Sequence, residues 1–128
     1  MTNPGLPARR ARENRQEARR RGQRAEVLAA LWLRLKGYRI LARGFRVPAG
    51  EIDLIARRGG VLALVEVKAR PTLAAAREAI SARQRARIAR AAEAYVQRHP
   101  KLAGLALRFD AILLARGSLP RHIKSAWQ

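Results

Sequence analysis

The sequence contains no cysteine, so disulfide bonds and thiolate metal sites are excluded. Its two histidines, His99 and His122, are too few for a histidine-rich zinc site. No apolar run approaches the roughly 18 residues of a membrane span, and the N-terminus lacks the apolar stretch of a signal peptide. We therefore expect a cytoplasmic protein without a membrane-spanning segment.

Acidic residues are scarce as well. Nine Asp and Glu residues stand against 28 Lys and Arg residues, which gives a net charge of +19 and favours a polyanionic partner. The 24 arginines and 26 alanines are also what a GC-rich genome imposes, so codon bias and acidic membrane surfaces are alternative explanations. Only six aromatic residues occur, which disfavours a stacking platform for single strands and suits contact with a duplex backbone. We expect the partner to be nucleic acid, double-stranded or branched DNA, rather than a membrane.

The length of 128 residues fits one domain. Residues 1–21 carry Pro4, Pro7 and seven arginines without apolar periodicity, which predicts a flexible basic arm. Such an arm either adds phosphate contacts without sequence specificity or is a solvated tail. Residues 22–128 are predicted to form a single domain.

The domain is predicted to contain a helix, a strand, a hairpin of two strands, a long helix and a fourth strand, over residues 22–36, 38–47, 51–68, 74–98 and 105–115. Residues 119–128 add an edge strand or a turn. The first helix is expected to bury a stripe of large apolar residues, namely Leu28, Leu31, Trp32 and Leu35. The long helix is expected to turn Ile88, Ala91, Ala92, Tyr95 and Val96 to the core. This order predicts an α/β fold with a central mixed sheet flanked by helices.

The hairpin carries the most informative pattern. A two-residue turn at Gly59-Gly60 suits the primed hairpin turns, and it places Asp53 opposite Glu66 and Glu51 opposite Lys68. Side chains alternate along a strand, so all four project from one face. Opposed carboxylates destabilise a sheet, and a bound divalent cation would relieve the repulsion.

Asp53, Glu66 and Lys68 have the chemistry for hydrolysing a phosphodiester bond. Hard carboxylate ligands suit Mg²⁺ or Mn²⁺, and the adjacent lysine can position water or neutralise charge on the phosphate. Hydrolysis of an acid anhydride or of another ester fits the same residues. A further alternative is a salt bridge from Asp53 or Glu51 to Lys68 with no metal.

Three further features are candidates for the site. Glu26 interrupts the apolar run from Ala25 to Leu33, so it either joins the acids or sits at a wet edge of the helix. Gln84 lies near the core-facing side of the long helix and either reaches the site or makes a structural hydrogen bond. A row of arginines on the opposite face suits a phosphate backbone or is simply solvated; it comprises Arg83, Arg87 and Arg90.

The strings Gly50-Glu-Ile-Asp-Leu-Ile-Ala56 and Leu64-Val-Glu-Val-Lys-Ala-Arg70 resemble the signature of the bacterial YraN-like family. The likeness continues at Gly22–Glu26, Gly37-Tyr38, Arg83-Gln84 and Arg108-Phe109-Asp110. This family is similar to the restriction-endonuclease-like, or PD-(D/E)xK, superfamily, which includes archaeal Holliday-junction resolvases and the tRNA-splicing endonuclease fold.

The resemblance implies roles for individual residues. The superfamily's metal-binding acid matches Asp53, its second acid and its lysine match Glu66 and Lys68, and the acid on the first helix of resolvase-type members matches Glu26. Glu51 belongs to the YraN-like motif and is an accessory candidate. The chain departs from the pattern at Gly44 and Arg83, where asparagine and lysine are expected, and neither departure removes a metal ligand.

These observations lead to a predicted Mg²⁺- or Mn²⁺-dependent nuclease acting on DNA, including branched or processed structures. The alternative is a non-catalytic nucleic-acid-binding module that retains the endonuclease-like fold. A third reading is a basic interaction protein whose acids serve only the fold. The sequence leaves a homodimer open.

Overall fold

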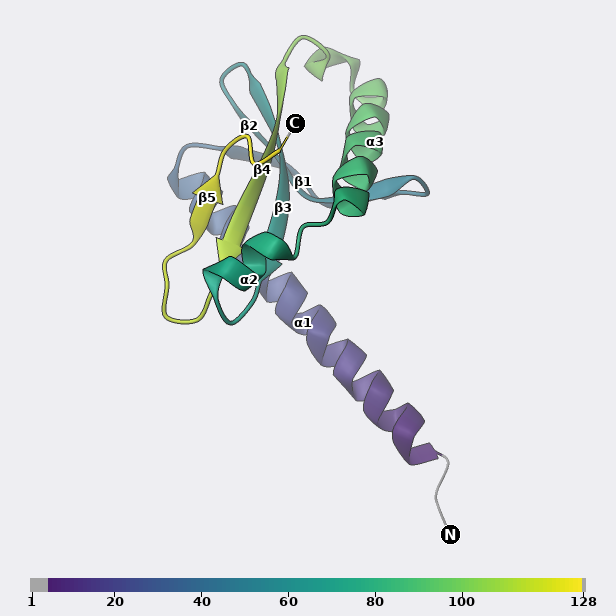
Figure 1. Cartoon of the computed structure of the whole chain (residues 1–128). Coiled ribbons are helices and arrows are strands. Elements are labelled where there is room, and N and C mark those ends of the chain that lie inside the picture. The colour runs from purple at the N-terminus through teal and green to yellow at the C-terminus, as the bar shows by residue number, and fades with distance from the viewer. Residues whose placement is uncertain (1–4, 128) are drawn as a thin grey trace.

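Five strands form one mixed sheet with helices on both faces (Figure 1). The computed structural model describes residues 5–127, with the backbone alone for residues 5–7. The strands, which neighbour one another in sequence order, are β1 (Arg39–Val47), β2 (Gly50–Arg58), β3 (Val61–Ala69), β4 (Ala106–Leu114) and β5 (Arg121–Ile123). The helices are α1 (Gly5–Leu35), α2 (Leu73–Glu78), α3 (Ala82–Arg98) and the 3₁₀ turn η1 (Pro100–Leu102).

The strand directions confirm the predicted mixed sheet. Strands β1, β2 and β3 form an antiparallel meander, and the connection through α2 and α3 returns the chain to place β4 parallel to β3. Strand β5 pairs antiparallel with β4 and is the predicted edge strand. A crossover through helices is what a parallel pair requires, because its strands run in the same direction.

The hairpin between β2 and β3 has the predicted register. Arg58 pairs with Val61 across the turn, where Gly59 adopts a φ of 56°, and the ladder runs as far as Leu54 and Val65. Beyond that pair the two strands separate, so Asp53 and Glu66 lie just past the end of the ladder. The separation matters because it opens a space between two otherwise hydrogen-bonded strands.

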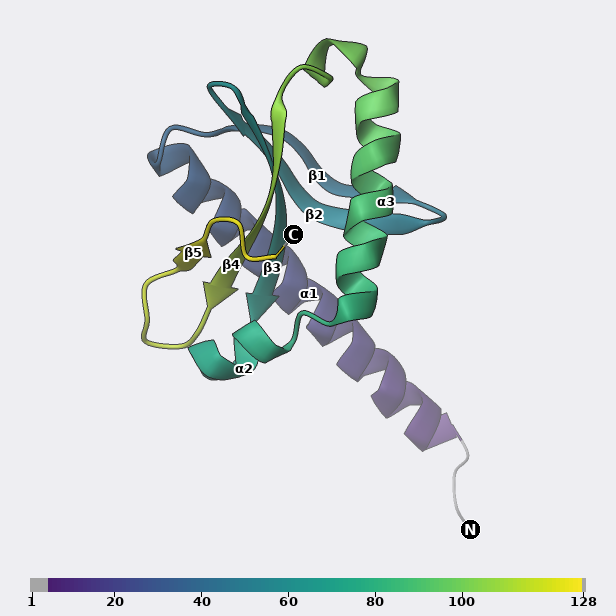
Figure 2. The same ribbon diagram turned by 45° about the horizontal axis from the view of Figure 1, so that its top comes forward.

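The sheet has a hydrophobic core on each face, and Figure 2 shows α1 and α3 on opposite sides of it. Helix α3 turns Ile88, Ala91, Ala92 and Tyr95 to one core, as predicted, while Val96 is only partly buried. Helix α3 also packs closely on β2. A Cβ added at Gly50 would lie 1.8 Å from the carbonyl oxygen of Arg87, so this contact requires glycine.

The buried face of α1 differs from the predicted stripe. The residues against the sheet are Ala25, Ala29, Ala30 and Leu33, whereas Leu28, Leu31 and Leu35 are 55%, 49% and 83% exposed, and Trp32 is half-buried. Alanines allow the helix axis to approach the sheet closely, and this packing leaves the larger side chains outside. The stripe prediction was therefore wrong, because helical spacing of apolar residues does not decide which of two apolar faces packs on the sheet.

The chain between β3 and β4 contains two helices rather than one. Ser81 is the N-cap of α3, and its hydroxyl accepts a hydrogen bond from the backbone N–H of Gln84 at 3.2 Å. Thr72 caps α2 in the same way. Ile80, at the break, is 8% exposed and packs into the core. The predicted continuous helix over residues 74–98 is therefore interrupted where a serine cap and a buried isoleucine redirect the chain.

Residues 5–21, which belong to the predicted basic arm, are helical. They form the first part of α1, which projects from the sheet with its residues from 8 to 24 exposed (Figure 1). Residues 1–4 lie outside the described part of the chain. Within residues 5–127, no helix combines the length and hydropathy that crossing a lipid bilayer requires.

Candidate functional site

A pocket of about 480 Å³ lies where β2 and β3 separate, bounded by α1 and by the first turn of α3. It brings together the predicted acids, the lysine and the amide, which are Glu26, Glu51, Asp53, Glu66, Lys68 and Gln84. We call it the carboxylate pocket. Arg21 and Arg70, which the sequence analysis did not assign to the site, also line it.

Asp53 occupies the gap between the two strands. Its Oδ2 accepts a hydrogen bond from the backbone N–H of Val67 at 2.8 Å, so the carboxylate takes the place that a strand carbonyl would have in a continued ladder. The carboxyl group is thus fixed at the floor of the pocket by the backbone of β3. Burial raises the pKa of Asp53, although the Val67 N–H and the charge of Lys68 act in the opposite direction.

Glu66 and Lys68 form an ion pair inside the pocket. Lys68 Nζ lies 3.1 Å from Glu66 Oε1, and the two side chains are 14% and 7% exposed, respectively. Burial and the neighbouring Asp53 carboxyl raise the pKa of Glu66 to about 7, even though Lys68 favours the ionised form. One lysine therefore does not neutralise the two buried carboxyls, and a further cation would lower their repulsion.

Glu26 faces the same pocket from α1. Burial and Asp53 raise its pKa, so its carboxyl interacts with the pair on the strands. Within residues 5–127, however, no three Asp, Glu or His side chains are placed to hold a metal ion together. The structure thus brings Glu26 to the site, and its role as a metal ligand stays a prediction.

Glu51 does not pair with Lys68 as the extended hairpin register implied. Its Oε2 lies 3.1 Å from Arg46 Nε on β1, and both side chains are well exposed. The strand separation explains the difference, because Glu51 lies beyond the last paired residues of β2 and β3. Glu51 therefore lines the carboxylate pocket but takes no part in the Glu66–Lys68 ion pair inside it.

Gln84 connects Lys68 to the start of α3. With its amide oxygen toward Lys68, Oε1 accepts a hydrogen bond from Nζ at 2.9 Å and Nε2 donates to the Ala79 carbonyl at 3.0 Å. With the side-chain amide turned the other way, Gln84 Oε1 accepts only from the Ser81 N–H, at 3.4 Å. We therefore assign the orientation in which Oε1 faces Lys68. The lysine is then held between Glu66 and Gln84.

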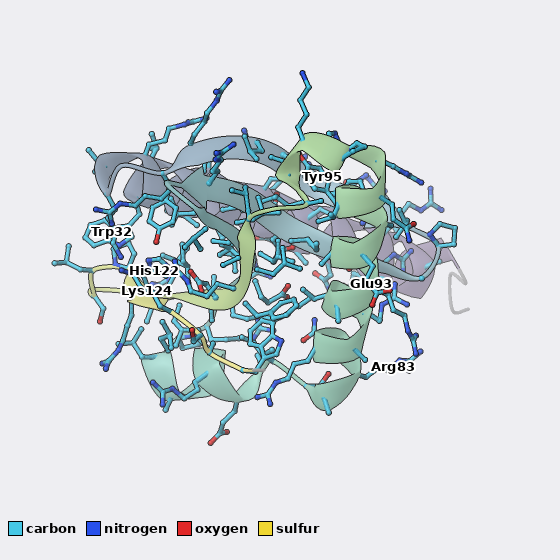
Figure 3. The ribbon with its side chains drawn as sticks, turned by 90° about the horizontal axis from the view of Figure 1, so that it is seen from above. Trp32, Arg83, Glu93, Tyr95, His122 and Lys124 are labelled. Carbon is cyan, nitrogen blue, oxygen red and sulfur yellow. The ribbon has the colours of Figure 1, made fainter. Side chains whose placement is uncertain are left out.

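The three arginines predicted to contact phosphate lie along α3. Arg83 and Arg90 are exposed, and Figure 3 shows Arg83 at the outer side of the helix. Arg87 is half-buried and lines a separate groove with Arg46 and Glu51. Arg87 is thus linked to the carboxylate pocket through Glu51, which lines both hollows, whereas none of the three arginines lines that pocket itself. Their contact with nucleic acid stays a prediction.

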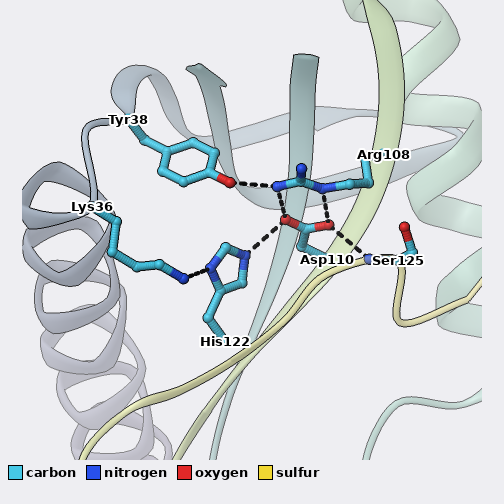
Figure 4. Close-up of polar contacts among 6 residues, drawn as sticks. All are labelled: Lys36, Tyr38, Arg108, Asp110, His122 and Ser125. Carbon is cyan, nitrogen blue, oxygen red and sulfur yellow. Dashed lines mark hydrogen bonds and ion pairs between the residues drawn. The ribbon is translucent and has the colours of Figure 1, made fainter. Parts of the chain in front are cut away.

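A second polar cluster lies on the α1 side of the sheet (Figure 4). Asp110 is fully buried, and its two oxygens accept hydrogen bonds at 2.8 Å from Arg108 Nε and Nη2. His122 Nε2, also at 2.8 Å, and the Ser125 N–H, at 3.1 Å, bind the same carboxylate. Burial alone would raise the pKa of Asp110, but these donors hold it below its ordinary value.

The same cluster extends to the end of α1. His122 Nδ1 lies 2.6 Å from Lys36 Nζ, and Arg108 donates to the Tyr38 hydroxyl. With Nε2 donating to Asp110, Nδ1 is the acceptor for Lys36. The cluster ties β4, β5 and the start of β1 together, so we interpret it as structural. Asp110 belongs to the Arg108-Phe109-Asp110 string, but its partners come from distant segments and were not predicted from the sequence.

The fold and the pocket define an α/β protein with a buried carboxylate–lysine site at the point where two strands part. A family model described as "Uncharacterised protein family UPF0102" matches residues 25–114. The chain belongs to this family, which the sequence analysis named as YraN-like.

Close relatives cover most of the chain. A UPF0102 protein of Paramagnetospirillum magneticum is 56% identical over 117 residues, which span 88% of this chain and 91% of the relative. One from Methylobacterium nodulans is 59% identical over 107 residues, covering 84% and 83% of the two chains. One from a Bradyrhizobium species is 54% identical over 121 residues, covering 94% and 86%.

Proposed function

We propose that this chain is a divalent-metal-dependent nuclease that hydrolyses phosphodiester bonds in DNA. One observation carries the proposal. The Asp53 carboxylate is held in the gap between β2 and β3 by the Val67 N–H, beside the buried Glu66–Lys68 pair. Two carboxyls and a lysine inside a pocket on a chain of net charge +19 fit a polyanionic, hydrolysable substrate.

The donor set fits Mg²⁺ or Mn²⁺. Mg²⁺ in phosphate-processing sites is commonly held by one or two carboxylates together with water and substrate phosphate, so Asp53 and Glu66 suffice. Their pKa values are raised by burial, which means that a cation would replace protons at both groups. When bound, such a cation supplies positive charge that stabilises the transition state of phosphodiester hydrolysis.

The side chains of the pocket then have distinct tasks. Lys68 Nζ, held by Glu66 Oε1 and Gln84 Oε1, has a fixed position from which it can donate to a phosphate oxygen or orient the attacking water. Glu26 adds a carboxyl group to the pocket from the α1 side. Preorganised placement of this kind is what electrostatic catalysis requires.

A second candidate function is a non-catalytic nucleic-acid-binding module. It is favoured by the absence, within residues 5–127, of three acidic or histidine groups arranged to hold a metal together. This module would bind DNA through its arginines with a strong salt dependence and no turnover. The two functions separate on a single property, which is cleavage that depends on a divalent cation.

Cleavage of a substrate panel tests the proposal. Duplex, flap, four-way-junction and RNA substrates are incubated with the full chain in Mg²⁺, in Mn²⁺ and in excess chelator. We expect cleavage of DNA only with the divalent cation, and loss of cleavage in Asp53→Asn. Glu93→Gln on the exposed side of α3 is the matched control and should cleave like wild type. If wild type cleaves nothing, the binding-module function replaces the nuclease.

A further inference from the structure

A second pocket adjoins the carboxylate pocket along α1. It has a volume of about 580 Å³ and lies between α1 and the segments that follow β3 and β4. Its lining includes four arginines, which are Arg21, Arg24, Arg70 and Arg116, and the apolar residues Leu28, Pro71 and Leu114. We call it the arginine pocket.

The location of this pocket suits a ligand. Strands β3 and β4 are parallel, and their carboxyl ends meet at the Ala69–Leu114 pair, where the Arg70 N–H donates to the Leu114 carbonyl at 3.0 Å. In open α/β sheets, ligands bind outside the carboxyl ends of parallel strands. Figures 1 and 2 both show α1 running past the ends of β3 and β4. Residues of α1 from Arg21 to Leu28 contribute to the lining of the pocket.

The charge of the arginine pocket is unbalanced. No acidic residue lines it, and among residues 8–127 none of its four arginines forms an ion pair with a carboxylate. Within the described residues, the side chains of Arg70 and Arg24 donate hydrogen bonds only to the backbone carbonyls of Ala69 and Arg20. Four guanidinium groups beside apolar side chains fit a ligand with an anionic and an apolar part.

The two pockets are continuous. Arg21, Ala25, Ala69, Arg70 and Pro71 line both of them. Arg70 follows Lys68 by two residues, which is about 6.6 Å along an extended chain. A strand whose phosphate sits at Lys68 therefore extends directly past Arg70 into the arginine pocket.

We infer that the arginine pocket holds an unpaired nucleotide next to the phosphodiester in the carboxylate pocket. The inference rests on the proposed function and names its substrate class, DNA with a strand that leaves the duplex. The guanidinium groups bind its phosphates, and the base lies against the apolar lining residues Leu28, Pro71 and Leu114. A base inside a duplex is stacked and cannot enter such a pocket. The scarcity of aromatic residues limits this contact to a single pocket rather than an extended stacking surface.

Binding without turnover tests the inference. The full chain, in excess chelator, is titrated against three labelled DNAs: a duplex with a thymidine flap, the same duplex with an abasic flap, and a plain duplex lengthened to carry the same number of phosphates. We expect the thymidine flap to bind about tenfold tighter than the abasic flap, because the base buries apolar surface against the aliphatic side chains of the arginine pocket.

Two pairs of variants give the decisive comparison: one pair leaves the charge of the chain unchanged, and the other removes two positive charges from different places. Leu28→Gln should reduce that ratio to near one while leaving duplex affinity unchanged. Leu35→Gln, on the same exposed side of α1 but outside the pocket, should behave like wild type. Arg24→Ala/Arg116→Ala should lower flap affinity more than duplex affinity. Arg34→Ala/Arg39→Ala removes the same amount of charge outside the pocket and should lower flap affinity and duplex affinity equally.

The outcomes separate this inference from the proposed function. Equal binding of thymidine and abasic flaps by wild type overturns it, as does a Leu28→Gln protein that keeps the wild-type ratio. Divalent-dependent cleavage without a flap preference would leave the nuclease proposal standing and remove only the nucleotide pocket. If the thymidine flap binds tighter than the abasic flap, this difference depends on Leu28, and no DNA is cleaved, the nucleotide pocket is supported and the nuclease proposal is overturned.

Discussion

Replacing Glu66 with glutamine removes a buried carboxyl whose ionisation opposes folding. The Glu66 side chain is 7% exposed, and burial together with Asp53 raises its pKa from 4.5 to about 7. At about 1.4 kcal/mol per pKa unit, this shift corresponds to about 3 kcal/mol between the protonated and ionised forms. The effect belongs to the interacting Asp53–Glu66 pair rather than to one residue.

The sign of the pH dependence follows from the direction of the shift. The unfolded chain releases the Glu66 proton near pH 4.5, whereas the folded chain keeps it up to about pH 7. The favourable contribution is therefore complete below pH 4.5 and is lost as the pH rises through 7. In chelator, we expect Glu66→Gln to match wild type near pH 5 and to exceed it by up to about 3 kcal/mol at pH 8.

Urea unfolding followed by circular dichroism at pH 5, 6, 7 and 8 measures this difference. Glu93→Gln is the control, because Glu93 is exposed on α3 and its replacement should give a pH-independent difference. Adding Mg²⁺ at pH 8 should stabilise wild type and have little effect on Glu66→Gln. A difference between Glu66→Gln and wild type that does not grow with pH would refute the argument that the pocket stores unneutralised charge.

Three other predictions concern the fold and the basic surface. Asp110→Asn should lower the free energy of unfolding, measured by urea unfolding at pH 7, by about 3–5 kcal/mol, because Arg108 loses its buried partner. Since the pKa of Asp110 is lowered in the folded chain, the stability that its carboxylate contributes in wild type is lost only as the pH falls below 3.8. Gly50→Ala should cost about 1–3 kcal/mol or more in the same assay, because its Cβ would overlap the Arg87 carbonyl, and an unchanged stability would contradict the packing of α3 on β2. Deleting residues 1–21 should make the dependence of duplex affinity on salt shallower in anisotropy titrations, and an unchanged slope would show that this segment does not contact phosphate.

Local pattern was sufficient to place the core of the site. The Gly59-Gly60 turn and the alternation around it predicted the register of β2 and β3, and with it the proximity of Asp53 and Glu66. Strand separation past Leu54 was not predictable in the same way. It depends on Asp53 replacing a backbone acceptor, which becomes visible only when the side chain is placed.

Tertiary contacts decided the features that the sequence analysis missed. The exposed position of Leu28 on α1 follows from the close packing of alanines on the sheet, which helical spacing alone does not predict. Asp110 binds His122, and His122 in turn contacts Lys36, so the cluster joins opposite ends of the domain sequence. No local spacing marks such a cluster, although a charged residue within an apolar strand indicates that a partner is required.

The most direct test of the central claim compares cleavage with binding in Lys68→Ala. The variant removes one of 28 basic residues, so its affinity for DNA should stay within about twofold of wild type. Its cleavage rate in Mg²⁺ or Mn²⁺ should fall by about a hundredfold or more, because an electrostatic contact to the transition state is lost. A Lys68→Ala protein that cleaves at the wild-type rate would contradict the assignment of the carboxylate pocket as the active site.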